Sequence, residues 1–365
     1  MKESVVPGTL DSNSGVLLDS FTRPPVNEYA ALKQLITKRK LLDQQPRYYT
    51  YKFLFTLGLL IVGVVFLLVV HNFWLQLCDA AYLAFVFGQI GLLSHDVGHR
   101  QIFHAAWKHN LASMLLGDVL IGMSYKWWIG KHNQHHAYPN QFDMDPDLDI
   151  PTICFSQEEA LGKRKLRRLL ASYQAYAFFP LMLFVGIDFQ RTSIFYVLRK
   201  QGKERLLEVA LLFVHYLLYF GLIFSQMSFW QGIVFIFVNQ AFFGLYIGSI
   251  FAPNHKGMPM LEKSNKMDFL RRQVLTARNV SSHPFNDFWY GGLNYQIEHH
   301  LFPSMPRNNL KEAQKVIKLF CQEHEIMYCE TGMLQSYKEI LQFLHEIGAP
   351  LRQYSEKSNG RFRSI

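Results

Sequence analysis

Hydrophobic residues along this chain gather in four long runs. They cover residues 53–70, 74–93, 206–224 and 230–251. Asp79 and Glu208 are the only charged residues within them. Each run is close to the roughly 20 residues that a helix needs to cross about 30 Å of hydrocarbon. Because short polar segments join the runs in pairs, the pattern predicts an all-α membrane protein with four transmembrane helices in two hairpins.

Lysine and arginine flank these runs on one side only. The hairpin tips, residues 71–73 and 225–229, contain neither residue. The basic residues instead precede the first hairpin, lie between the hairpins, and follow the second: Lys38, Arg39, Lys40, Arg47, Lys163, Arg164, Lys165, Arg167, Arg168, Lys311, Lys315 and Lys318. The positive-inside rule therefore predicts a multi-pass protein with both termini cytoplasmic, in the plasma or inner membrane if the source is bacterial. Trp74 and Trp230 are expected at the opposite interface.

The segments outside the spans follow weaker patterns. Residues 1–45 are expected to be a mobile N-terminal segment followed by a basic interfacial helix. Residues 46–325 form the predicted membrane domain, in which the short apolar stretch 175–187 reads as interfacial or re-entrant. Apolar residues at helical spacing then predict an amphipathic cap and tail over residues 326–365.

Composition agrees with this class. Of 365 residues, 50% are hydrophobic and 18% charged, which disfavours a disordered or coiled-coil chain. The four cysteines form no Cys-x-x-Cys pair, which argues against a disulfide scaffold, a zinc ribbon or a rubredoxin-type iron site. The net charge of +9 is explained by the basic residues that flank the spans, so nucleic acid is not an expected partner.

Histidines gather just beyond the predicted cytoplasmic helix ends. His95 and His99 are separated by one helical turn, and so are the outer members of the string His132, His135 and His136. Such spacing puts imidazoles on one face of a helix. The third string repeats it with an amide in front, and one further histidine follows the fourth run: Gln296, His299, His300 and His255.

Eight imidazoles from four segments exceed what one structural zinc uses, so two metal ions are the natural count. A neutral nitrogen shell suits iron and would hold magnesium or calcium poorly. An iron pair with positions open to dioxygen is therefore predicted. Gln296 either ligates a metal weakly or orients a bound water, and Asp96 and Glu298 could orient imidazole N–H groups.

Other polar features receive simpler interpretations. Seven histidines occur singly and are expected to be solvated or hydrogen-bonded: His71, His104, His109, His215, His283, His324 and His345. The alternating aspartates between Asp143 and Asp149 begin like an EF-hand loop, but Leu148 and Cys154 stand where the loop needs glycine and glutamate. We expect a solvated acidic loop near the second histidine string. Trp127 and Trp128 are candidate wall or interface residues.

The strings His-Asp-x-x-His, His-x-x-His-His and Gln-Ile-Glu-His-His-Leu-Phe-Pro resemble those of the integral-membrane fatty acyl desaturases. The glutamine-led third string is similar to the subgroup of front-end and related bacterial acyl desaturases. The resemblance implies a di-iron enzyme that uses dioxygen to introduce a cis double bond into an acyl chain. Its implied metal ligands are the eight histidines named above, with Gln296 where many relatives have histidine.

The resemblance also implies partners. The substrate would be a fatty acyl chain on coenzyme A, a carrier protein or a lipid. Because the sequence contains no His-Pro-Gly-Gly haem motif, electrons are expected from a separate ferredoxin or b-type cytochrome, which the basic cytoplasmic surface would suit if the donor is acidic.

Three alternatives stay open on the residues. A membrane hydroxylase or ketolase of a lipid, alkane or carotenoid would use a similar histidine shell. A metal transporter would need ionisable ligands near the bilayer midplane, where the runs offer no carboxylate because Asp79 lies near the outer end and Glu208 near the start of its run. A zinc hydrolase would use three protein ligands and leave five histidines idle.

Overall fold

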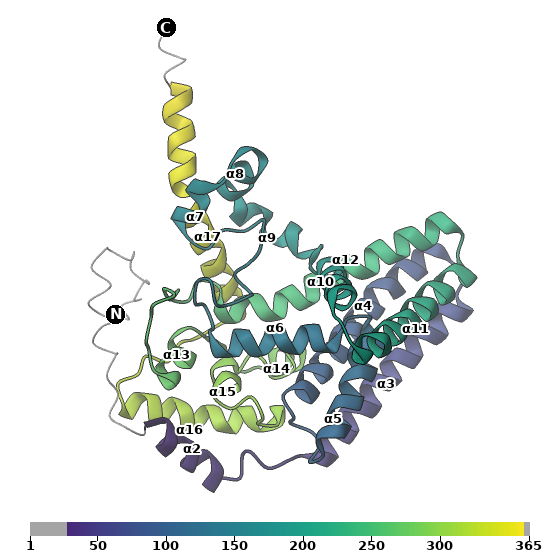
Figure 1. Ribbon diagram of the computed structural model, residues 1–365, viewed down its shortest axis with the longest axis horizontal. Helices are drawn as coiled ribbons and strands as arrows, with labels where there is room; N and C mark the ends of the chain where they lie inside the picture. Colours follow the sequence, from purple (N-terminus) through teal and green to yellow (C-terminus); the bar gives the residue numbers. More distant parts are fainter. Residues whose placement is uncertain (1–27, 361–365) are drawn as a thin grey trace.

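The computed structural model describes residues 28–360, and its architecture is almost entirely helical (Figure 1). The predicted mobile segment therefore lies largely outside the described residues. The elements of the first half are α2 (Glu28–Lys38), α3 (Pro46–Val69), α4 (Phe73–Gly98), α5 (Ala106–Ser113), the π-helix η1 (Met114–Ile121), α6 (Tyr125–Ala137), α7 (Gln157–Gly162), α8 (Lys165–Ser172), α9 (Gln174–Met182) and α10 (Val185–Arg199). Those of the second half are α11 (Lys203–Gln226), α12 (Phe229–His255), α13 (Phe269–Leu275), β1 (Asn279–Val280), α14 (Pro284–Trp289), α15 (Gln296–Leu301), the 3-10 turn η2 (Arg307–Asn309), α16 (Leu310–Glu323), β2 (Glu330–Thr331) and α17 (Met333–Gly360).

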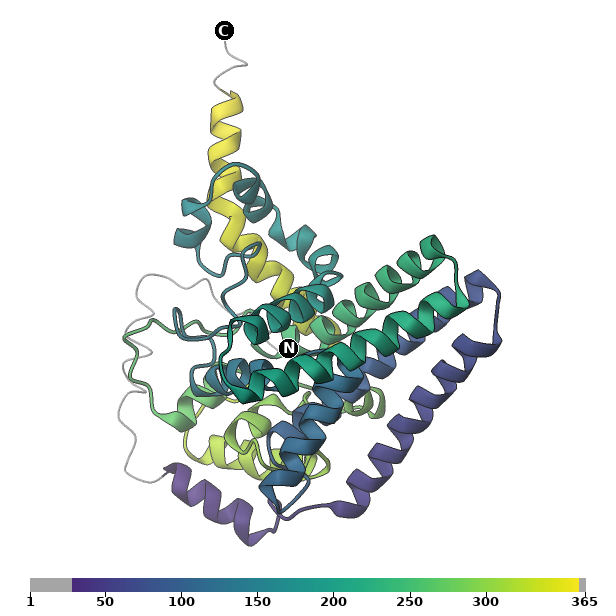
Figure 2. The same cartoon turned by 45° about the vertical axis from the view of Figure 1, so that its right-hand side comes forward.

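Four of these helices, α3, α4, α11 and α12, are long and apolar enough to cross a membrane, as the sequence predicts. They run side by side away from the rest of the molecule in both ribbon views (Figures 1 and 2). The helices continue past the apolar runs: α3 starts at Pro46, and α4 and α12 extend to Gly98 and His255. The extensions of α4 and α12 carry His95 and His255 into the body of the protein.

Local sequence fixes the hairpin tips. The side chain of Asn72 accepts a hydrogen bond from the backbone N–H of Leu75 and so caps the start of α4. Ser228 and Gln231 form a capping box at the start of α12. Each cap therefore satisfies a backbone N–H at the start of its helix that has no acceptor within the helix.

Helices α4 and α12 form the inner pair of the bundle. Burial reaches 61% of the apolar window of α4 but only 17% of that of α3, which faces outward. Gly88 of α4 lets the Tyr246 ring of α12 approach closely, since a Cβ there would lie 2.1 Å from a ring carbon. Asn239 Nδ2 also donates to the carbonyl oxygen of Ala80 at 2.9 Å. The inner pair is thus held by close packing and by polar contacts shielded from lipid.

The stretch predicted as interfacial or re-entrant is a bent helix pair. Helices α9 and α10 meet at 69°, and together they have the length and composition of a broken span or a re-entrant loop. Helix α10 packs beside α12 and α11.

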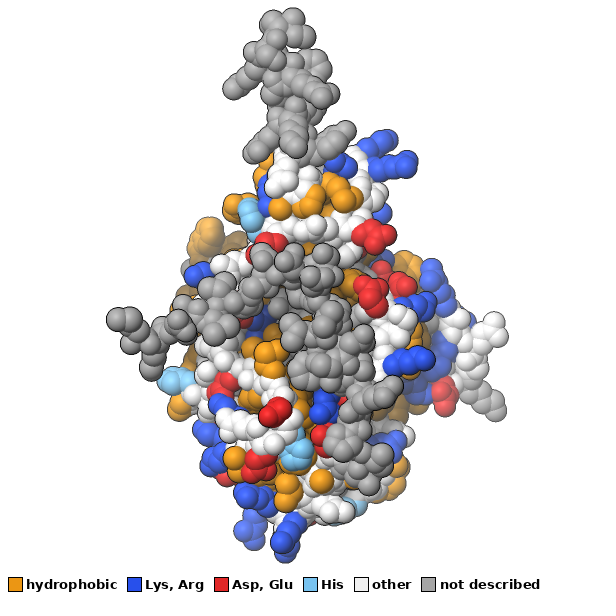
Figure 3. Space-filling model, turned by 90° about the vertical axis from the view of Figure 1, so that its left-hand side faces the viewer, with side chains coloured by type: hydrophobic (Ala, Val, Ile, Leu, Met, Phe, Trp, Pro, Cys, Tyr) orange, Lys and Arg blue, Asp and Glu red, His pale blue; other side chains and the backbone are white. Residues whose placement is uncertain are grey.

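The remaining elements form a body at the end of the spans opposite the hairpin tips. Leu32 and Ile36 of α2 enter the same apolar core as Leu301 of α15 and Ile317 of α16. Strands β1 and β2 form a two-stranded parallel pair beside this core. The outer face of the body carries charged side chains of both signs (Figure 3).

Helix α17 packs against α7, α8, α9 and the end of α12. Its Ile340 and Leu344 pack against Phe178 and Met182 of α9. This is the apolar face that the helical spacing in the C-terminal sequence predicts.

Candidate metal centre

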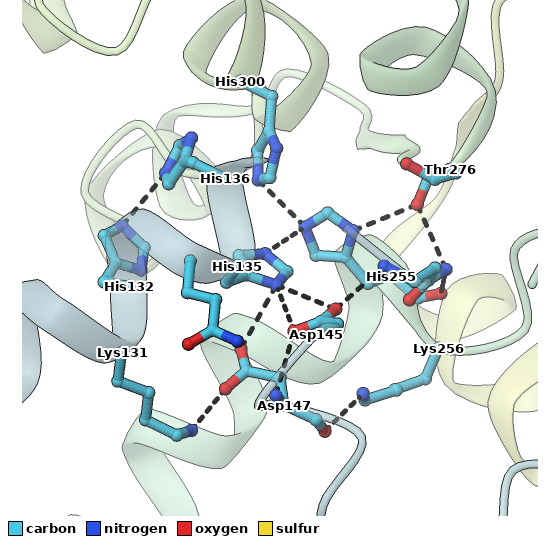
Figure 4. A network of polar contacts seen from close by, with 12 residues as sticks. Lys131, His132, His135, His136, Asp145, Asp147, His255, Lys256, Thr276 and His300 are labelled. Carbon is cyan, nitrogen blue, oxygen red and sulfur yellow. Dashed lines mark hydrogen bonds and ion pairs between the residues drawn. The ribbon is translucent and has the colours of Figure 1, made fainter. Parts of the chain in front are cut away.

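Four separate segments bring histidines to one place in the body. His95 lies in the last turn of α4, and His99 caps the C-terminus of this helix. Helix α6 and the short α15 contribute two strings, and the last residue of α12 completes the set: His132, His135, His136, His299, His300 and His255. All eight predicted histidines therefore meet at the end of the inner helix pair, in two groups that we name the five-histidine and three-histidine clusters. Figure 4 shows the three-histidine cluster together with His132 and His136 of the other group.

The five-histidine cluster comprises His95, His99, His132, His136 and His299. The Nε2 atom of His132 lies 3.2 Å from that of His95, 2.8 Å from that of His99 and 3.0 Å from that of His136. The Nε2 atoms of His136 and His299 are 3.1 Å apart. The four rings other than His132 are buried, and that ring is only partly exposed.

The three-histidine cluster comprises His135, His255 and His300. The Nε2 atom of His255 is 3.3 Å from that of His135 and 3.1 Å from that of His300. The side-chain nitrogen of Gln296 lies 2.9 Å from the same His255 atom. The two clusters adjoin, since the rings of His136 and His300 stack with centroids 4.2 Å apart.

The donor set fits transition-metal ions. Imidazole nitrogens bind such metals at about 2.1 Å, so two ligands that meet at a right angle lie about 3.0 Å apart. The Nε2 separations, 2.8 to 3.3 Å, match this spacing. Burial, assisted by the neighbouring imidazoles, lowers the pKa of five rings: His99, His132, His136, His299 and His300. These imidazoles are therefore neutral, the form that binds metal.

Hydrogen bonds at Nδ1, the ring nitrogen that faces away from the cluster, orient the three rings of the three-histidine cluster. His135 Nδ1–H donates to Asp145 at 3.0 Å, and His300 Nδ1–H donates to Gln273 Oε1 at 2.9 Å. His255 Nδ1–H donates to the carbonyl oxygen of Thr276 at 3.0 Å. Because Nδ1 carries the proton in each ring, the Nε2 lone pair points into the cluster.

Asp145 is itself held firmly. Its carboxylate accepts the backbone N–H groups of Asn140 at 2.8 Å and Asp147 at 2.9 Å. Lys131 pairs with the Asp147 carboxylate, and Lys256 donates to the Asp147 carbonyl at 3.0 Å (Figure 4). Burial lowers the pKa of His135, but the carboxylates of Asp145 and Asp147 outweigh burial and raise it overall. In the three-histidine cluster, His135 is thus the ring whose Nδ1–H is held by a carboxylate.

Asp96 and Glu298, the carboxylates that the sequence proposes as ring-orienting groups, bond elsewhere. Asp96 pairs with the buried guanidinium of Arg307, and its nearest oxygen is 3.6 Å from His95 Nδ1, beyond hydrogen-bond range. Glu298 accepts hydrogen bonds from Asn279 Nδ2 at 2.6 Å and from the hydroxyl of Tyr328 at 2.7 Å. Burial raises the pKa of Glu298 to about 7.

The acidic loop lies near the second histidine string, as the sequence predicts, but the expectation that it is solvated is wrong for Asp145, which is buried against His135 and was not identified as its contact. Its position nine and ten residues after His136 and His135 is the signal that could have found it. Gln273 and Thr276 carry no such signal, because they are single polar residues far along the chain. Trp128 stacks on His132 with ring centroids 4.6 Å apart, so it belongs to the wall of the five-histidine cluster.

Four of the singly occurring histidines, His109, His215, His283 and His324, make side-chain hydrogen bonds, as expected. His109 contacts the carbonyl oxygen of Val97 at 3.0 Å, and His215 that of Val119 at 2.9 Å.

Known proteins resemble this chain over most of its length. Residues 72–332 match the family model described as Fatty acid desaturase. The Delta(8)-fatty-acid desaturase of Euglena gracilis is 30% identical over 331 residues, which cover 85% of this chain and 77% of the relative. The Delta(6)-fatty-acid desaturase fat-3 of Caenorhabditis elegans is 29% identical, with 87% and 74% covered. The Acyl-lipid (9-3)-desaturase of Physcomitrium patens is 29% identical over 88% of this chain, which spans only 63% of that relative.

Proposed function

The chain belongs to the fatty acid desaturase family, and from this premise we propose that it introduces a cis double bond into a fatty acyl chain. In this reaction dioxygen, two electrons and two protons combine with the two hydrogens removed from adjacent methylenes, giving two water molecules. The acyl chain is oxidised and dioxygen is reduced. The enzyme is accordingly an oxidoreductase.

One observation carries the proposal: imidazoles from four distant segments meet in two adjoining buried clusters at the end of an apolar bundle. The five-histidine and three-histidine clusters would each hold one iron ion, and Gln296 borders the second. Bound iron would supply dioxygen activation, which no amino-acid side chain provides. The chain's own residues set the geometry, because Asp145, Gln273 and Thr276 fix three of the rings before metal arrives.

The protein is a multi-pass membrane protein, which suits an acyl substrate. Burying the acyl chain among the helices would contribute roughly 0.8 kcal/mol per methylene. We place both termini and the clusters on the cytoplasmic side, because the basic residues lie at that end of the spans. There a separate donor protein, a ferredoxin or a b-type cytochrome, would deliver the electrons.

The test is lipid profiling of a host before and after expression, with double-bond positions mapped by mass spectrometry. We expect a new unsaturated acyl product that requires dioxygen. His135→Ala and His299→Ala should abolish it while the chain still inserts in the membrane. His345→Ala is the matched control, since this exposed ring lies outside both clusters, and it should retain activity.

The outcomes separate this function from its alternatives. A hydroxylated or oxidised product without a double bond would favour a hydroxylase or ketolase. Metal analysis of active protein should find two iron ions per chain. One zinc and no iron would contradict the proposal.

A further inference from the structure

Gln296 occupies the place beside the three-histidine cluster where a fourth ligand would stand. The residue is 3% exposed, and both ends of its amide have a partner. Its Nε2 atom is 2.9 Å from Nε2 of His255, and its Oε1 atom is 3.0 Å from Nδ2 of Asn254. The question for the chemistry is which end of this amide faces the cluster.

The orientation of Asn254 decides which end faces the cluster, because backbone carbonyls fix which side-chain atom of Asn254 lies opposite Gln296. Asn254 Nδ2 donates to the carbonyl oxygen of Leu293 at 2.9 Å and approaches that of Ile250 at 3.3 Å. A carbonyl oxygen only accepts, so the asparagine must turn its nitrogen toward these two groups. The same nitrogen faces Gln296. Turning Asn254 over would set its oxygen against the Leu293 carbonyl in a site with 0% exposure.

The glutamine orientation follows from that of the asparagine. Since Asn254 presents N–H, the atom of Gln296 opposite it must be the accepting oxygen. The Gln296 NH₂ group therefore points at the cluster, toward His255 Nε2. The nitrogen lone pair of an amide is delocalised into the carbonyl, so this end of the side chain donates hydrogen bonds and does not ligate a metal.

We propose that Gln296 is a hydrogen-bond donor beside the metal that His135, His255 and His300 would hold, and that Asn254 is the positioning residue that keeps the Gln296 N–H turned toward it. This inference rests on the proposed function and deepens it. The ligand that fits the position is a small anion or an oxygen-containing molecule, because such a ligand accepts the N–H while it binds the metal. A preorganised donor of this kind favours negative charge in a buried site.

The proposal and its rival predict opposite results. If Gln296 donates a hydrogen bond, removing its amide weakens the binding of a small anion. If Gln296 ligates the metal through oxygen, removing it opens a position and strengthens that binding. Azide is a suitable probe, because it binds ferric iron and accepts hydrogen bonds.

The experiment titrates azide into the purified, oxidised, iron-loaded full chain and follows the absorption band of the complex. Gln296→Leu should bind azide about tenfold more weakly than the unchanged chain, which is the loss of one hydrogen bond to a charged group. Gln296→Asn, which withdraws the N–H by one methylene, should also bind it more weakly and serves if the leucine variant folds poorly. Gln190→Leu is the control: this glutamine of α10 bonds to the Ile121 carbonyl, away from the clusters, and its loss should leave azide affinity unchanged.

Iron content is measured first for every variant. Two iron ions per chain with weaker azide binding would support the proposal. Unchanged or tighter azide binding would overturn it, and so would loss of iron from folded Gln296 variants, because a donor that is not a ligand is not needed to hold the metal. Absence of iron from the unchanged chain would instead refute the proposed function, so the two failures are distinguishable.

Discussion

Replacing Asp145 should weaken metal binding in a graded way. The carboxylate is 4% exposed and accepts His135 Nδ1–H through both oxygens, at 3.0 and 3.1 Å. Asp145→Asn keeps one oxygen for the ring but loses the negative charge. Asp145→Ala removes the contact altogether. The ring of His135 would then be free to rotate its Nε2 away from His255.

The expected magnitudes follow from these contacts. A hydrogen bond to a charged group contributes about 1.5–3 kcal/mol and a neutral one about 1 kcal/mol, so Asp145→Asn should lower metal affinity roughly fivefold. Loss of a ring-orienting group lowers affinity about 10–100-fold, which is the range expected for Asp145→Ala. The alanine variant also leaves the N–H groups of Asn140 and Asp147 unpaired, at about 1–3 kcal/mol of folding stability for each.

The assay is competition for iron against a chelator of known affinity, with the thermal unfolding of the metal-free protein measured alongside. The second measurement separates lost stability from lost affinity. Asp149→Asn is the matched control, since it removes a charge from the same acidic run at an exposed position. Wild-type iron affinity in a folded Asp145→Ala variant would refute the reasoning that this carboxylate aims the ring.

Three further predictions concern stability, measured by thermal unfolding. Arg307→Leu leaves the buried Asp96 carboxylate without its cation and should lower the free energy of unfolding by about 3–5 kcal/mol. Adding Asp96→Asn to the same chain should restore part of this loss. An unchanged free energy of unfolding in the single variant would contradict the prediction. Gly88→Ala should destabilise by about 1–3 kcal/mol because the new methyl meets the Tyr246 ring, whereas Gly58→Ala, with open space around it, should not; equal effects would contradict the packing argument. Removing bound metal with a chelator should lower the unfolding temperature, and adding iron back should restore it, because a ligand that binds only the folded state stabilises that state. An unchanged unfolding temperature would contradict the prediction.

The sequence was sufficient for the features that depend on local pattern. Apolar runs of spanning length predict the four long helices, and the structure contains them. The run boundaries were less informative, because α4 and α12 carry polar residues such as His95 and Asn254 that are buried in the body instead of ending the helix. Burial with partners, which local hydropathy does not report, lets these helices continue.

Within the histidine clusters, too, local sequence predicts one part of the arrangement and the tertiary structure decides the other. The spacing of His132, His135 and His136 predicts imidazoles within one helical turn, but 3.6 residues per turn directs His135 away from the other two. The structure accordingly joins His132 and His136 to the five-histidine cluster and His135 to the three-histidine cluster.

The sequence by itself determined which side chains have the chemistry to bind metal and that most of them stand at the ends of apolar helices, because both properties depend on short stretches of chain. Only the tertiary structure decided how these side chains are grouped, which carboxylate orients a ring, and which end of the Gln296 amide faces the three-histidine cluster. Those outcomes depend on contacts between residues that are far apart in the sequence, such as Asn254 with the Leu293 carbonyl. The direction of a hydrogen bond is settled by its partner, and the fold supplies the partner.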